Sequence, residues 1–163
     1  EYKAAKVPPR DVFPQSFDIA DVLYWVNHEP AFGKQAVYLD DANAVADLPD
    51  RKTLADYKSR GINFWAPPTF ALLAAEGGKI VPSQAARDAK AAGLGLITWT
   101  LERSGILADG HNGWYYQTFD SAVNTEGDML QALHVLAKDV GVVGVFSDWP
   151  ATTTFYANCM DLR

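Results

Sequence analysis

Apolar residues gather in five short runs along the chain, and each run contains β-branched or aromatic side chains. Most runs are apolar at consecutive positions, which is typical of strands that are covered on both faces and therefore of a parallel sheet. The expected strands are residues 12–17, 35–39, 62–66, 94–101 and 142–147. The pattern predicts a parallel sheet of five strands.

Between these runs the apolar residues take the spacing of amphipathic helices. Each expected helix begins at a capping residue or proline, and most end at a glycine. Five helices are expected. The first follows the cap Asp18, the second covers about 51–60 between the cap Asp50 and Gly61, and the third lies between the cap Ser83 and Gly93. The fourth covers 129–140, after a Thr125/Asp128 capping box and before Gly141, and the fifth begins at Pro150. Alternating strands and helices predict right-handed βαβ units and an α/β fold, in a single region over residues 1–163.

Two connections are long, at residues 42–50 and 103–124. The second exceeds the roughly 12–15 residues beyond which loops are commonly functional or disordered. It carries His111, Trp114, Tyr115 and Tyr116 among several glycines. These residues are consistent with a lid that closes over a binding site, or with aromatic anchors that hold the loop on the rim of the fold, and we favour the anchors.

The composition narrows the classes of partner. The formal net charge is −6, and no cluster of basic residues is visible, so we expect no nucleic acid and no adhesion to an anionic membrane. The longest strongly apolar run, residues 140–146, is far shorter than the roughly 20 residues of a bilayer helix, so we expect no transmembrane segment. The single Cys159 has no internal disulfide partner, which leaves a disulfide to residues outside this chain or a buried free thiol.

Chemistry in a parallel α/β fold is expected at the carboxyl ends of the strands. The residues that leave the expected strands there are polar or aromatic. They include Gln15, Ser16 and Phe17 after the first strand, Asp40 and Asp41 after the second, Trp99, Glu102 and Arg103 after the fourth, and Asp148 after the fifth.

Three of these strand ends resemble motifs of the glycerophosphodiester phosphodiesterase family. They are "VFPQSFD" at 12–18, "GLGLITWTLERSG" at 93–105 and "VGVVGVFSDWP" at 140–150, in the family's order and spacing. The resemblance implies the C-terminal part of a TIM (β/α) barrel with parallel strands. It also implies hydrolysis of glycerophosphodiesters to glycerol 3-phosphate and an alcohol, with a divalent metal, Mg or Ca.

The family's catalytic histidines and metal ligands belong to the first half of its barrel, and their motifs are absent from this sequence. The resemblance therefore implies no catalytic residue and no metal ligand in this chain, and it makes the N-terminal half of the same barrel the expected partner. We expect the isolated chain to be inactive, and its open half barrel to expose an apolar face and strand edges that promote aggregation.

The resemblance implies that Trp99 lines the mouth of the pocket, although a purely structural plug remains an alternative. Glu102 stands where many family members have Asn. With Arg103 it is expected to shape the alcohol and glycerol subsites, unless the two form a surface salt bridge with each other. Gln15 and Ser16 are candidates for orienting other groups. For Asp148 we favour a structural role as a helix cap.

Two other functions stay open from the sequence. The chain is also consistent with a non-catalytic binding module that keeps the pocket wall, because the family's histidine pair is absent. A related phospholipase-type phosphodiesterase is the third possibility. Relatives with this loop pattern are often exported, so a secreted or periplasmic location is favoured.

Overall fold

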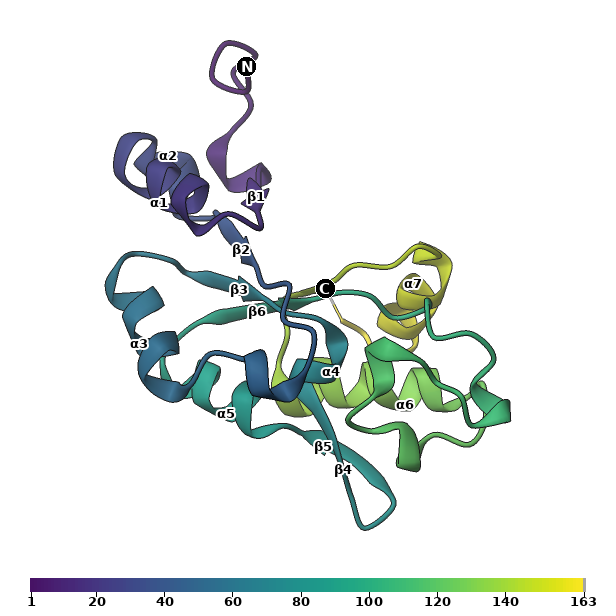
Figure 1. Ribbon diagram of the computed structural model, residues 1–163. Coiled ribbons are helices and arrows are strands. Elements are labelled where there is room, and N and C mark those ends of the chain that lie inside the picture. The colour runs from purple at the N-terminus through teal and green to yellow at the C-terminus, as the bar shows by residue number, and fades with distance from the viewer. Residues whose placement is uncertain (163) are drawn as a thin grey trace.

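The structure is a computed structural model that describes residues 1–162, and it has an α/β fold built on a five-stranded sheet (Figure 1). The strands follow the order β1-β2-β3-β6-β7, and every neighbouring pair is parallel. Their bounds are β1 Gln15–Ser16, β2 Val37–Leu39, β3 Phe64–Ala66, β6 Gly95–Thr98 and β7 Gly144–Val145. Each lies within one of the five predicted segments and is shorter than it, so the predicted parallel sheet is confirmed.

An antiparallel hairpin, β4 Leu73–Glu76 with β5 Lys79–Pro82, was not expected from the sequence. Its turn is Gly77–Gly78, and both glycines have positive φ, at 57° and 74°. Such values match a type I′ turn, in which both central residues need the left-handed region. The Gly-Gly pair between two short apolar runs was therefore a usable hairpin signal.

Three predicted helix starts are confirmed by side-chain caps. Asp18, Asp50 and Ser83 accept backbone N–H bonds from Ala20, Thr53 and Ala86 at the starts of three helices. The α-helices are α1 Ile19–His28, α2 Pro30–Gly33, α3 Arg51–Ser59, α4 Thr69–Leu72, α5 Gln84–Ala91, α6 Asp128–His134 and α7 Pro150–Cys159. Cys159 at the end of α7 is exposed, so the alternative of a buried thiol is wrong.

The predicted helix over 129–140 is divided into two parts. The α-helical part is α6, and the chain continues as a π-helix, η6 Val135–Val140, up to Gly141. The Asp128 carboxylate accepts the backbone N–H groups of Asn124 and Thr125, both at 2.8 Å. The Thr125 hydroxyl bonds to Asp128 instead of capping the helix, so only the acidic half of the expected capping box is present.

The helices pack on one face of the sheet. Trp65 and Leu96 are fully buried on that face together with Leu54 of α3, Ala89 of α5 and Leu136 of η6. Figure 1 shows α3, α5 and α6 on the same side of β3 and β6. A second cluster adds α1 around Val22, and a third adds α7 around Tyr156.

The opposite face carries the residues that alternate with the helix-facing ones, because successive side chains of a strand point to opposite sides. Phe13 and Phe64 touch on this face, as do Phe17 and Trp99, with ring centroids 5.6 and 5.8 Å apart. Phe13 is 49% exposed, Phe17 52% and Phe146 38%. One face of the sheet is therefore a packed core, and the other presents aromatic rings to solvent.

The helices within residues 1–162 are short relative to the thickness of a bilayer. Not one of them combines the length and the apolar composition that a crossing requires.

Substitution of Gly33 tests the packing of α2 against α1. A Cβ at this position would lie 2.5 Å from the Trp25 carbonyl oxygen and 2.6 Å from the Val26 Cα, both of which are backbone atoms. We expect Gly33→Ala to lower the free energy of unfolding by about 1–3 kcal/mol, the usual cost of overpacking. Gly127→Ala is the matched control in a denaturant titration, because its Cβ would meet its nearest neighbour at 3.5 Å. Equal stability of the two variants would contradict this packing.

The bonds to Asp128 predict a pH dependence of stability. The pKa of this carboxyl is lowered from 3.8, chiefly by the backbone N–H of Asn124. The folded state therefore binds this proton less readily than the unfolded state. The ionised Asp128 carboxylate therefore adds to the free energy of unfolding above pH 3.8. This stabilisation is lost as the pH falls through the lower pKa that Asp128 has in the folded state. We expect Asp128→Asn to cost about 1 kcal/mol at neutral pH, the difference between hydrogen bonds to a charged and to a neutral acceptor, and much less in strong acid. The exposed Asp139 on η6 provides the control Asp139→Asn, and a cost independent of pH would contradict the assignment.

Candidate functional site

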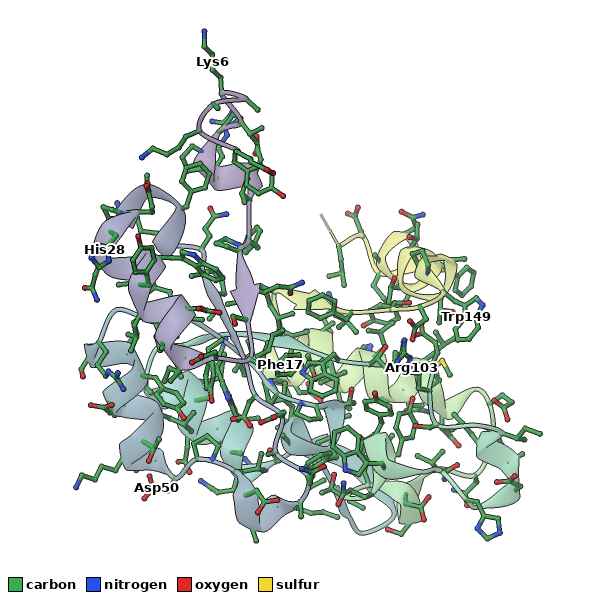
Figure 2. The ribbon with its side chains drawn as sticks, turned by 45° about the horizontal axis from the view of Figure 1, so that its top comes forward. Lys6, Phe17, His28, Asp50, Arg103 and Trp149 are labelled. Carbon is green, nitrogen blue, oxygen red and sulfur yellow. The ribbon has the colours of Figure 1, made fainter. Side chains whose placement is uncertain are left out.

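A hollow of about 260 Å³ lies where β6 and β7 end, at the edge of the sheet where ligands are expected in this kind of fold. Figure 2 labels Phe17 and Arg103, which follow β1 and β6. The residues that line the hollow are Trp99, Thr100, Arg103, Tyr115, Phe146, Ser147 and Asp148. Two of the strand ends that were singled out in the sequence therefore contribute to one site.

Arg103 and Asp148 form a bidentate ion pair in this hollow. The Arg103 Nε and Nη2 atoms donate to the two Asp148 carboxylate oxygens at 2.7 and 2.9 Å. These bonds lower the pKa of Asp148 and raise that of Arg103. The expected cap at Asp148 is wrong, because Trp149 is the residue before α7 and makes no side-chain cap.

Glu102 does not pair with its neighbour Arg103. Its carboxylate accepts hydrogen bonds from the Ser147 hydroxyl and from the backbone N–H of Asp148. The alternative of a Glu102–Arg103 surface salt bridge is therefore wrong. Both charged residues instead connect the segment after β6 to the segment after β7, across about 45 residues of sequence.

Trp99 forms one wall of the hollow and is held on several sides. Its indole N–H donates to the Ala66 carbonyl at 2.9 Å, so this group is engaged within the protein. Its ring meets those of Phe17, Trp114 and Tyr115, with centroids 5.8, 5.8 and 5.9 Å apart. Trp99 can therefore offer a ligand the flat surface of its ring, while its indole N–H is already bonded within the protein.

Gln15 and Ser16 differ in what they contact. The Ser16 hydroxyl donates to the Asp21 carboxylate at 2.8 Å and accepts the backbone N–H of Asp18, so it stabilises the start of α1. Gln15 is exposed and, by alternation, shares the face of the sheet that carries Phe17. Neither residue lines the hollow at β6 and β7.

The long segment over residues 103–124 is folded onto the rim. It contains three short 3₁₀ helices: η3 Leu107–Asp109, η4 Trp114–Tyr116 and η5 Asp120–Ala122. The Trp114 indole and the Gln117 amide both donate to the Asn43 carbonyl, at 2.9 and 3.2 Å. Thr118 donates to the Phe70 and Leu73 carbonyls, so the anchored interpretation is the one that the contacts favour.

The four residues proposed for a lid therefore differ. Tyr116 is fully buried, and its hydroxyl donates to the Leu101 carbonyl at 2.8 Å, so it belongs to the core. Tyr115 lines the hollow, and Trp114 packs between Trp99 and Phe70. His111 is exposed, and its backbone N–H bonds to Asp109.

The other two histidines lie on helices. His28 stacks on Tyr24 at 4.3 Å, and the His134 Nδ1 atom lies 3.0 Å from the Tyr156 hydroxyl. Within the part of the chain that the structure describes, no three His, Cys, Asp or Glu side chains come together in a way that could hold a metal ion.

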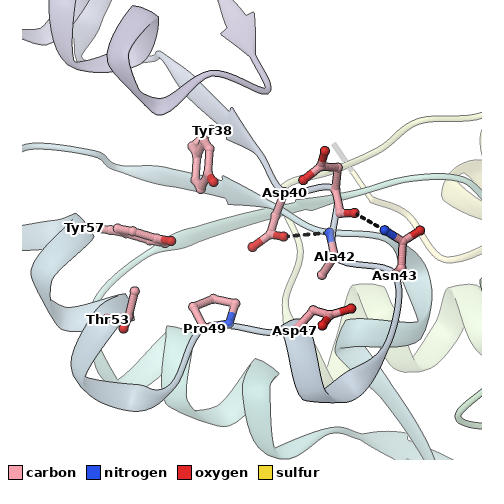
Figure 3. Close-up of a pocket in the computed structure, with 9 residues that line it drawn as sticks. Tyr38, Asp40, Ala42, Asn43, Asp47, Pro49, Thr53 and Tyr57 are labelled. Atoms are coloured by element: carbon pink, nitrogen blue, oxygen red, sulfur yellow. Dashed lines mark hydrogen bonds between the residues drawn. The ribbon is translucent and has the colours of Figure 1, made fainter.

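A second cavity, of about 420 Å³, lies between the end of β2 and α3 (Figure 3). Asp40 is its most buried carboxylate, and it accepts bonds from the Trp65 indole N–H at 2.8 Å and the Ala42 backbone N–H at 3.0 Å. Burial raises the pKa of Asp40, and it also raises the pKa of Tyr38 and Tyr57 in the same cavity. Asp40 faces the helix layer, because it alternates with Leu39, and so it lies apart from the hollow at β6 and β7.

Removal of the Tyr116 hydroxyl tests whether the segment over 103–124 is anchored. In Tyr116→Phe the buried Leu101 carbonyl loses its partner, and we expect the free energy of unfolding to fall by about 1–3 kcal/mol. Backbone amides in this segment should also exchange faster with deuterium. Tyr24→Phe is the control, because Tyr24 is exposed on α1. Unchanged stability and exchange would indicate a mobile lid instead.

No family model matches the chain. A protein of Arthroderma benhamiae named "Extracellular protein" is 43% identical to it over 170 residues, which is 99% of this chain and 68% of the relative. Identity at this level over almost the whole chain means a shared fold and descent. The chain belongs to the same family as this extracellular protein.

Proposed function

We propose that this chain is the C-terminal part of a (β/α) barrel that hydrolyses glycerophosphodiesters in a metal-dependent reaction. The observation that carries the proposal is that the three motif-bearing strands bring their carboxyl ends together on the same side of a parallel sheet. Phe17 after β1 touches Trp99 after β6, and Arg103 after β6 binds Asp148 after β7. The three motifs are separated in sequence, and their convergence supports a common site.

The two faces of the sheet support a barrel. The core clusters lie on the face of Trp65 and Leu96, while Phe13, Phe17 and Phe146 are exposed on the other. In a doubly wound fold helices would cover both faces, whereas in a barrel the inner face is covered by the remaining strands. β1 and β7 stand at the two edges of the sheet, where further strands would pair.

The proposal gives this chain the wall of the pocket and not its reactive groups. Trp99 supplies an apolar surface, and Arg103, Asp148 and Ser147 supply polar groups beside it. The described residues do not fit a divalent metal, because no three of their His, Cys, Asp or Glu side chains form a group that could hold one. As the resemblance implies, the proposal assigns the metal and the proton-transferring groups to the first half of the barrel, and it attributes no step of the reaction to residues of this chain.

Secretion is part of the proposal. The Arthroderma benhamiae relative is named an extracellular protein, and the resemblance to exported phosphodiesterases points the same way. Under this proposal the exposed Cys159 would meet an oxidising environment, in which a disulfide to a cysteine outside this chain can persist.

The proposal is tested with the full-length polypeptide that contains this chain. We expect it to release glycerol 3-phosphate from glycerophosphodiesters, to lose this activity in a chelator and to regain it with Mg²⁺ or Ca²⁺. We expect residues 1–163 alone to be inactive. Binding without any turnover would favour the non-catalytic module, and a cyclic phosphate product would favour the phospholipase-type enzyme.

Trp99 allows a sharper version of this test. Trp99→Phe keeps a flat ring and loses the bond to Ala66, whereas Trp99→Ala removes the wall. We expect KM to rise roughly tenfold for the alanine variant, about 1.4 kcal/mol of lost contact, and less for phenylalanine. Trp149→Ala is the control, since Trp149 is exposed and does not line the hollow. An unchanged KM in Trp99→Ala would remove Trp99 from the site.

A further inference from the structure

The hollow at β6 and β7 has a lining without net charge. Among the described residues that line it, the charged ones are Arg103 and Asp148, which are bonded to each other at 2.7 and 2.9 Å. The nearby Glu102 carboxylate is outside the lining and is taken up by Ser147 and the Asp148 backbone. An anionic ligand would have to compete with Asp148 for Arg103, and a cationic ligand with Arg103 for Asp148. An uncharged ligand can use both groups with the pair intact.

The pair leaves donors and acceptors open. A guanidinium has five N–H bonds; the pair uses two of them, and Arg103 also interacts with the Tyr115 hydroxyl, so at least two N–H groups remain for a ligand. Carboxylate oxygens accept more than one hydrogen bond, so Asp148 keeps acceptor capacity, and the Tyr115 hydroxyl can both donate and accept. A rim that offers donors and acceptors together matches hydroxyl groups, which are donors and acceptors themselves.

The rest of the lining is flat and apolar. Trp99 and Phe146 contribute aromatic rings, and Tyr115 stands nearly perpendicular to Trp99, at 77°. A cyclic polyol has an apolar face of C–H groups and a rim of hydroxyls, so it can lie on an aromatic ring while its rim reaches polar side chains. The volume, about 260 Å³, is below the roughly 300–1,000 Å³ of sites for drug-sized ligands, which suits one ring and not a whole lipid.

We propose that this hollow binds a cyclic polyol, an inositol or a hexose, as the alcohol side of the phosphodiester. Arg103 and Asp148 act as one unit, in which Arg103 contacts the hydroxyls and Asp148 positions the guanidinium. The link to a phosphodiester rests on the proposed function, whereas the polyol site itself rests on the geometry of the hollow.

Binding is measured on the full-length polypeptide by ligand-observed NMR, with myo-inositol, glucose, glycerol, choline and inorganic phosphate as separate probes. We expect one of the two cyclic polyols to bind most tightly, and the comparison of inositol with glucose identifies which. Asp148→Asn and Arg103→Lys should each weaken it about tenfold, the effect of losing one hydrogen bond to a charged group. Tighter binding of choline, phosphate or glycerol would overturn the proposal, as would unchanged binding in both variants.

A matched ion pair provides the control. Arg60 and Asp56 form an exposed salt bridge at 3.5 Å, with Asp56 on α3, and neither residue lines the hollow. Asp56→Asn and Arg60→Lys should leave polyol binding unchanged. If they weaken it as much as the hollow variants do, the effect is not specific to the site, and the proposal falls.

A comparison of substrates separates this inference from the proposed function. If the full-length polypeptide binds the polyol through Arg103 and Asp148 but hydrolyses no phosphodiester, the polyol site stands and the proposed function fails. If it cleaves glycerophosphocholine at least as efficiently as glycerophosphoinositol and its glucosyl analogue, and Asp148→Asn does not change that ratio, the enzyme stands and the polyol site fails.

Discussion

The hydrogen bonds between the ends of β3 and β6 are the constraint on which the site depends. The Thr98 hydroxyl donates to the Pro67 carbonyl at 2.9 Å, and the backbone N–H of Thr69 donates to the Trp99 carbonyl at 2.8 Å. With the indole bond to Ala66, they fix both the backbone and the ring of Trp99. Because side chains alternate along a strand, a slip of one residue would turn Trp99 into the helix layer and remove the wall of the hollow.

Two carboxyl groups near the strand ends, Asp148 and Asp40, have opposite electrostatic environments. Asp148 has a guanidinium partner, and the pKa of its carboxyl falls. Asp40 is buried with only the N–H groups of Trp65 and Ala42 as donors, and its pKa rises. The net charge of −6 therefore says little about the hollow, where Asp148 is matched by Arg103 among the described residues of the lining.

Much of the fold could be predicted from local pattern. Short apolar runs predict the place of all five parallel strands, although β1 itself is the polar pair Gln15–Ser16 within such a run. Asp18, Asp50 and Ser83 predict helix starts, because a cap depends only on neighbouring residues. The π-helix over 135–140 has the same apolar stripe as an α-helix, so periodicity could not separate the two.

The side-chain contacts of the site could not be predicted from local sequence patterns. The pairing of Arg103 with Asp148, and not with Glu102, depends on how the ends of β6 and β7 are aligned across the sheet. Ser16 has a strand-end position but bonds to Asp21, because α1 begins at Ile19, only three residues after Ser16, and brings Asp21 of its first turn within reach. The sequence thus predicts which residues lie at the carboxyl ends of the strands. Whether such a residue contacts another side chain or a ligand depends on how the neighbouring strands are aligned.

The hollow also depends on the face of the sheet that the helices leave uncovered. Trp99 and Phe146 belong to this face by alternation, together with the exposed Phe13 and Phe17. Aromatic side chains on a parallel sheet gain most when they are covered, since removing apolar surface from water contributes about 25 cal/mol per Å². In the proposed barrel the same closure that covers Phe13 and Phe17 would also wall the open side of the hollow. Stability of the sheet and enclosure of the ligand would then have one physical origin.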